Sequence, residues 1–157
     1  GIHSFPTRRS SDLIVLRRNL PDIGESELSA LIDAGEGSPG QALGLAGLDL
    51  AGLDSALQAI ARNGDPDNAV RAELAQSLSS KAAQRRYEAF LGRVPTFIAQ
   101  EARNRHGRAL ALALEAWSAA RSLAESAVRQ SLDPQMTVFS LAGHVAALVP
   151  GANHAKA

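Results

Sequence analysis

Histidine is the side chain of this sequence best suited to acid–base or metal chemistry near neutral pH. The four histidines are His3, His106, His144 and His154, and the chain has no cysteine. His106 and His144 lie far apart in the sequence, and neither an H-x3-H nor an HExxH spacing occurs. Without cysteine, a thiolate zinc site, a disulfide framework and a cysteine nucleophile are all excluded. The sequence therefore predicts no catalytic residue and no metal ligand.

A glycine-rich run occupies positions 35–40 and could be taken for a phosphate loop. Such a loop also needs a lysine that reaches the phosphates, and this run has none. Ser38 followed by Pro39 is instead typical of a helix N-cap with proline at the first helical position. No serine lies in a G-x-S-x-G nucleophile elbow. We interpret the run as a tight turn followed by a helix start.

Arginine outnumbers lysine 14 to 2 in this chain, whose formal net charge is zero. Glutamates are interspersed among the arginines, so we expect no basic stripe of the kind that binds nucleic acid directly. The arginines form either a solvated helix face or part of a protein interface, where their planar groups pair with carboxylates. Those in the middle of the chain are Arg71, Arg85, Arg86, Arg93, Arg103, Arg105 and Arg108.

Helices must position these side chains. The 157 residues include 30 alanines and 21 leucines, which are strong helix formers, whereas aromatic residues make up only 4%. No run alternates β-branched and polar residues over the length of a strand. The sequence predicts an all-α, soluble fold that is long enough to bury its own core.

Helical spacing of apolar residues, punctuated by proline, glycine, asparagine and aspartate, gives the predicted elements. We expect helices at about 14–20, 24–34, 39–46, 49–63, 65–78, 81–104, 107–131 and 134–148. Pro95 lies inside the helix at 81–104 and should kink or split it, because proline removes a hydrogen bond and clashes one turn back. The apolar residues of the helix at 107–131 are Leu110, Leu114, Trp117, Leu123 and Val128.

The first thirteen residues look foreign to the rest of the chain. Residues 4–13, SFPTRRSSDL, match what a common sequencing adapter encodes in one reading frame. We therefore expect residues 1–13 to be an adapter artefact, with a disordered tail as the alternative, and the native protein to extend upstream of Ile14.

Trp117 is the single tryptophan, and alanines surround it at positions 113, 116, 119 and 120. Alanine-rich faces let helices approach closely, so this region is either packed in the core or forms a seam between subunits. Our candidate core or interface residues are Trp117, Arg121 and Phe139.

Three segments, residues 20–43, 81–91 and 114–141, resemble the C-terminal part of the delta-prime subunits of bacterial DNA polymerase III clamp loaders. The most specific of the shared features is the GSPG-x-AL turn after a short acidic helix, at residues 37–43. A Leu-Asp-Pro-Gln step at residues 132–135, before the last helix, is also similar. The resemblance covers essentially the whole chain from Ile14 onward.

The turn departs from its counterpart in the ATPases of the same assembly, which reads GS-x-R-x-AL and uses its arginine to contact the nucleotide. That arginine falls on Gly40 here, and glycine cannot make a charge-assisted contact to phosphate. The resemblance therefore implies that Gly37, Ser38, Pro39 and Gly40 form a degenerate nucleotide-sensing turn, as in a subunit that does not hydrolyse ATP.

The resemblance also implies a domain organisation and a role. Residues 14–46 would form the small helical lid of an AAA+ module, residues 48–149 an antiparallel helical collar domain, and residues 150–157 a frayed tail. The chain would be a non-catalytic stator without a cofactor, packed with other clamp-loader subunits in a cytoplasmic hetero-pentamer for DNA replication. It would meet the sliding clamp and primed DNA only indirectly, and it would not contact a membrane.

An alternative from another class is the ligand-binding helical domain of a transcriptional regulator. Such domains are also all-α and rich in alanine and leucine. A ligand pocket between helices is usually lined by aromatic and apolar side chains, which are few in this sequence.

Overall fold

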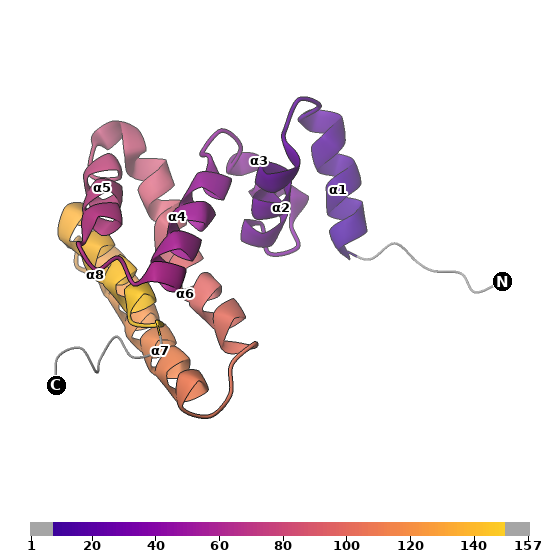
Figure 1. The fold of residues 1–157 in the computed structure, drawn as a ribbon. Coiled ribbons are helices and arrows are strands. Elements are labelled where there is room, and N and C mark those ends of the chain that lie inside the picture. The colour runs from indigo at the N-terminus through magenta and orange to yellow at the C-terminus, as the bar shows by residue number, and fades with distance from the viewer. Residues whose placement is uncertain (1–7, 150–157) are drawn as a thin grey trace, which may run out of the picture. The chain divides into compact units, whose positions relative to one another are not determined.

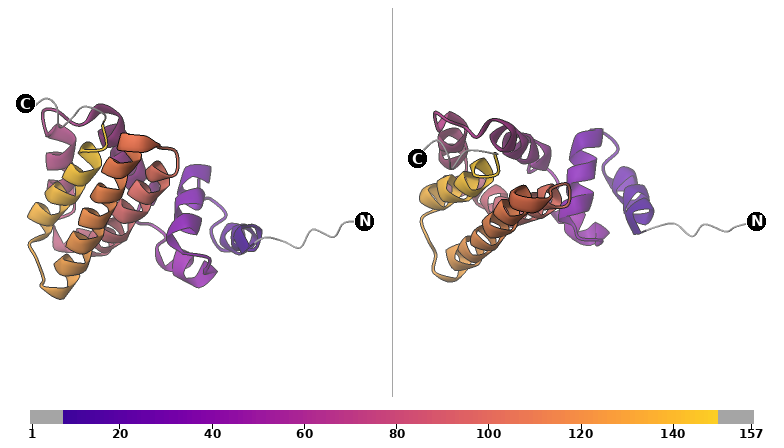
Figure 2. Two further views of the ribbon diagram at one scale, coloured as in Figure 1. Left: turned by 90° about the horizontal axis from the view of Figure 1, so that it is seen from below. Right: turned by 60° about the horizontal axis from the view of Figure 1, so that its bottom comes forward.

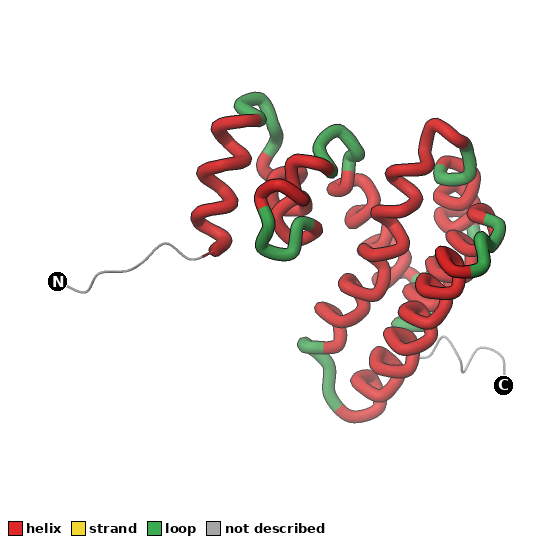
Figure 3. Tube along the Cα trace, turned by 180° about the vertical axis from the view of Figure 1, so that it is seen from behind, coloured by secondary structure: helices red, strands yellow, loops and turns green. Residues whose placement is uncertain are grey.

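The computed structural model describes residues 8–149 and divides the chain into two compact units, Gly1–Ala51 and Gly52–Ala157 (Figure 1). Its described part contains eight α-helices and one short 3-10 helix, joined by turns and without a strand (Figure 3). The predicted all-α class is confirmed. The division falls a few residues after the predicted change of domain near Leu48.

The first unit contains α1 (Arg8–Asn19), α2 (Glu25–Ala34) and α3 (Pro39–Gly44), each of which packs against the other two. Apolar residues at i, i+3 and i+4 give α2 one buried face, where Leu28 and Leu31 are fully buried and Ile32 is nearly so. Gly24 and Gly35 lie at its two caps. The predicted helix at 24–34 and its apolar face are confirmed.

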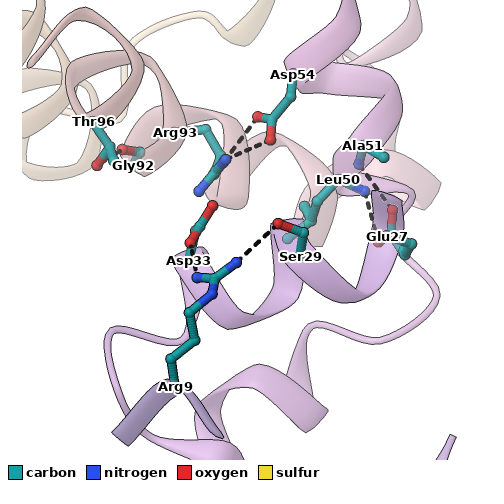
Figure 4. A network of polar contacts seen from close by, with 10 residues as sticks. All are labelled: Arg9, Glu27, Ser29, Asp33, Leu50, Ala51, Asp54, Gly92, Arg93 and Thr96. Carbon is teal, nitrogen blue, oxygen red and sulfur yellow. Dashed lines mark hydrogen bonds and ion pairs between the residues drawn. The ribbon is translucent and has the colours of Figure 1, made fainter. Parts of the chain in front are cut away.

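The start of α1 differs from the prediction, because the helix begins at Arg8 rather than Ile14. Residues 8–13 are therefore helical and not a disordered tail. Asp12 is buried, and Arg9 donates hydrogen bonds to Asp33 (2.8 Å) and to the Ser29 hydroxyl (3.1 Å) of α2 (Figure 4). The Arg9 contacts hold the first turns of α1 against α2. The adapter origin of residues 1–13 stays a prediction, and residues 1–7 lie outside the described part.

The second unit is built around three helices that lie side by side, α6 (Gln84–Ala102), α7 (Gly107–Arg129) and α8 (Pro134–Ala146) (Figures 1 and 2). α5 (Ala69–Ser77) packs against α8, and a 3-10 helix (Lys81–Ala83) leads into α6. α4 (Leu50–Asn63) begins in the last two residues of the first unit and continues into the second.

The core of the second unit consists of the apolar residues that the helical spacing singled out. Phe90 and Ile98 of α6 and Leu141 of α8 are fully buried. The predicted apolar faces of α4, α5, α6 and α8 are confirmed by the burial of Leu53, Leu57, Ile60, Leu74, Leu78, Tyr87, Phe90, Leu91, Val94, Phe97, Ile98, Val138, Leu141, Val145 and Leu148.

The start of α5 and the course of α6 also differ from the prediction. α5 begins at Ala69 rather than at the Asp65-Pro66 pair, because Asp65 and Asn68 both adopt left-handed backbone with φ of 48° and 62°. Pro95 does not split α6, which runs without interruption from Gln84 to Ala102. Because Pro95 has no backbone N–H, the Leu91 carbonyl one turn earlier lacks its helical hydrogen bond. The neighbouring Gly92 carbonyl accepts a hydrogen bond from the Thr96 hydroxyl (3.1 Å). The predicted frayed tail at residues 150–157 lies outside the described part.

The helix α7 buries alanines rather than its large apolar residues. Its buried residues are Ala113, Ala116, Ala120 and Ala127, which share a face, whereas Leu114 is 51% and Val128 70% exposed. Of the large apolar residues named for this helix, Leu110, Trp117 and Leu123 are half-buried, and Leu114 and Val128 are exposed. Small side chains let α7 pack closely between α6 and α8, and larger ones would not fit there.

We expect Ala120→Leu to lower the free energy of unfolding by about 1–3 kcal/mol, because the larger side chain overpacks a fully buried position. Urea unfolding followed by circular dichroism would measure this. Ala111→Leu is a matched control, since Ala111 is an exposed alanine of the same helix, and its effect should stay within about 0.5 kcal/mol. Equal effects at both positions would contradict the assignment of the buried face.

Candidate protein-interaction surface

The turn at residues 37–40 lies between α2 and α3 and is held by local hydrogen bonds. Gly37 has a φ of 82°, a left-handed conformation that glycine adopts without strain. The Ser38 hydroxyl accepts a hydrogen bond from the backbone N–H of Gln41 (3.3 Å), and Pro39 is the first helical residue. The predicted N-cap is therefore confirmed. Gly40 is exposed and presents no side chain, so this turn offers backbone groups and the Ser38 hydroxyl only.

Trp117 and Arg121, two of the three candidate residues, lie together on the surface of α7. The Arg121 guanidinium lies over the Trp117 ring, 5.4 Å from its centre, in a cation–π contact. Trp117 is half-buried, whereas Arg121 is exposed and also pairs with Glu125 (3.3 Å). Both partners of that ion pair are about 60% exposed, so it adds little stability. Neither candidate residue belongs to the buried core.

Phe139, the third candidate residue, lies elsewhere in the unit, on α8, where it is 36% exposed. The Arg71 guanidinium of α5 lies over its ring at 4.9 Å. Arg71 is also paired with Asp65 (3.1 Å), whose side chain is only 1% exposed. The structure thus joins Phe139 to an ion pair at the α5–α8 contact, an arrangement that the spacing of these residues does not predict.

The Asp65 carboxylate accepts several hydrogen bonds at the start of α5. It accepts hydrogen bonds from the backbone N–H groups of Val70 (3.0 Å) and Arg71 (2.9 Å) and from Nε of Arg71 (3.1 Å). Burial alone raises the pKa of Asp65, but these hydrogen bonds and the Arg71 charge outweigh burial and leave it below its ordinary value. Asp65 therefore caps the first turn of α5 from four residues before the helix.

Two polar contacts of α4 involve buried or capping groups (Figure 4). The Glu27 carboxylate accepts hydrogen bonds from the backbone N–H groups of Leu50 (2.9 Å) and Ala51 (2.8 Å), so it caps the start of α4. Further along α4, Asp54 accepts two hydrogen bonds from the Arg93 guanidinium, one of them from Nε at 3.0 Å. Both contacts satisfy groups that would be costly to bury unpaired.

An apolar groove runs between α6 and α7 and continues to the start of α8. It consists of two adjoining hollows of about 480 and 630 Å³, which share Glu88, Leu91 and Val128. We call it the α6–α7 groove, and its remaining lining residues are Gln84, Tyr87, Gly92, Ala124, Glu125, Ala127, Arg129, Ser131, Leu132 and Pro134. Val128 on its rim is 70% exposed. The sequence shows Val128 as an apolar residue of the helix at 107–131 but does not identify this groove.

A second apolar hollow, of about 420 Å³, lies between α5 and α8. Its lining includes Met136, which is 72% exposed, and Phe139. Exposed apolar side chains that gather in one place mark interaction sites more often than chance, whereas single ones need no explanation. The second unit therefore has two surfaces with the composition of a binding surface.

Two titratable side chains of the second unit have shifted pKa values. Burial raises the pKa of the Tyr87 hydroxyl, and the nearby charge of Asp133 raises it further. The Thr137 side chain lowers this pKa in part, although its contact with the Tyr87 hydroxyl falls short of a hydrogen bond. Burial lowers the pKa of His144 and so favours its neutral imidazole.

Among residues 8–149, no three histidine, aspartate or glutamate side chains come together as a metal site requires. No helix in that range combines the length and the apolar character that crossing a bilayer requires.

These features define the class of protein, an all-α chain whose second unit exposes apolar side chains in grooves between helices. No protein-family model, curated protein or solved structure matches this chain.

Proposed function

We propose that this chain is a non-catalytic scaffold that holds other protein subunits through its second unit. The observation that carries the proposal is the exposed apolar lining of the α6–α7 groove and of the α5–α8 hollow, with Val128 and Met136 each about 70% exposed. Surfaces of this kind lose unfavourable contact with water when a partner covers them. The chain itself needs to supply no chemistry in this role.

We further propose that the assembly is a bacterial clamp loader, in which this chain acts as the delta-prime stator subunit during DNA replication in the cytoplasm. The support is the turn at Gly37, Ser38, Pro39 and Gly40, whose sequence resembles the nucleotide-sensing turn of the clamp-loader ATPases and whose Gly40 cannot contact a nucleotide phosphate through a side chain. In this proposal the first unit is that lid and the second unit is the collar domain.

Co-purification tests this proposal directly. The tagged full chain would be co-expressed with the ATPase and delta subunits of a bacterial clamp loader and passed over affinity and size-exclusion columns. We expect a complex of fixed stoichiometry that survives size exclusion, because a collar contact should bury an area in the range of stable interfaces, about 1,200–2,000 Å². Recovery of the chain alone, under conditions in which the other subunits assemble with an authentic delta-prime subunit, would contradict the proposal.

The regulator-domain alternative stays a prediction. It requires a small molecule to occupy space between helices of the second unit. This alternative would be favoured over the scaffold if the chain bound no clamp-loader subunit and if an apolar ligand, found by screening, raised the melting temperature of the chain.

A further inference from the structure

We draw no further inference here: the strongest candidate, the apolar hollow between α5 and α8 whose lining includes the exposed Met136 and Phe139, is an unpartnered face, and nothing in the structure shows what covers it.

Discussion

Phe90→Ala is expected to lower the free energy of unfolding of the second unit by about 3–5 kcal/mol. The Phe90 ring is fully buried on α6, the helix that packs against both α7 and α8. Its removal loses the burial of the ring and leaves a cavity that the neighbouring helices can fill only in part. Urea unfolding followed by the fluorescence of Trp117, the single tryptophan and a residue of this unit, would measure the loss.

Phe139→Ala is the matched control for that experiment. Phe139 is 36% exposed, so its truncation creates no closed cavity and removes mainly the contact with the Arg71 guanidinium. We expect a loss of about 1 kcal/mol or less. A loss at Phe90 no larger than that at Phe139 would show that the three-helix core is not packed as described.

Asp65→Ala is the second substitution with a large expected effect, about 2–4 kcal/mol. It removes the carboxylate that pairs with Arg71 and that accepts the backbone N–H groups of Val70 and Arg71, so buried donors and a cation lose their partner. It also places alanine at a φ of 48°, which strains an L-residue with no side-chain hydrogen bond to offset it. Thermal and urea unfolding at pH 7 would measure the loss.

The Asp65 carboxylate also makes the stability of the second unit depend on pH in a defined direction. Its pKa in the folded chain lies below the ordinary value of 3.8, so the folded state favours the charged form. The resulting stability is fully present above the unfolded-state pKa and is lost as the pH falls through the lower folded-state pKa. Wild type and Asp65→Asn should therefore differ most above about pH 5 and converge as the pH falls below 3.8.

Asp65→Asn is chosen for this comparison because asparagine tolerates left-handed backbone and keeps one acceptor oxygen. Its loss at pH 7 should be smaller than that of Asp65→Ala. If the difference between wild type and Asp65→Asn stayed constant from pH 7 to pH 3, the carboxylate would not be the group that carries this stability.

The candidate site could be predicted only where it depends on local chemistry. Ser38 and Pro39 identify a helix start because a hydroxyl N-cap followed by proline needs no distant partner, and the Ser38 hydroxyl does accept the Gln41 N–H. Trp117 and Arg121 are four residues apart on one helix, a spacing that brings side chains together. The α6–α7 groove depends instead on how α7 lies against α6, and no local sequence pattern indicates it.

By itself, the sequence determined the helical class, most of the helices and the buried faces of α2, α4, α5, α6 and α8, because apolar spacing and capping residues act within one or two turns. The tertiary structure decided which face of α7 is buried, since that depends on how closely α6 and α8 approach it, and close approach selects Ala113, Ala116 and Ala120 over Leu114 and Val128. It also decided that Asp65 caps α5 from outside the helix, because the left-handed backbone at Asp65 and Asn68 folds the chain back onto Val70 and Arg71. Helix caps and apolar periodicity depend on residues close together in the chain. Contacts between helices depend on where neighbouring helices lie, and no local stretch of residues specifies those positions.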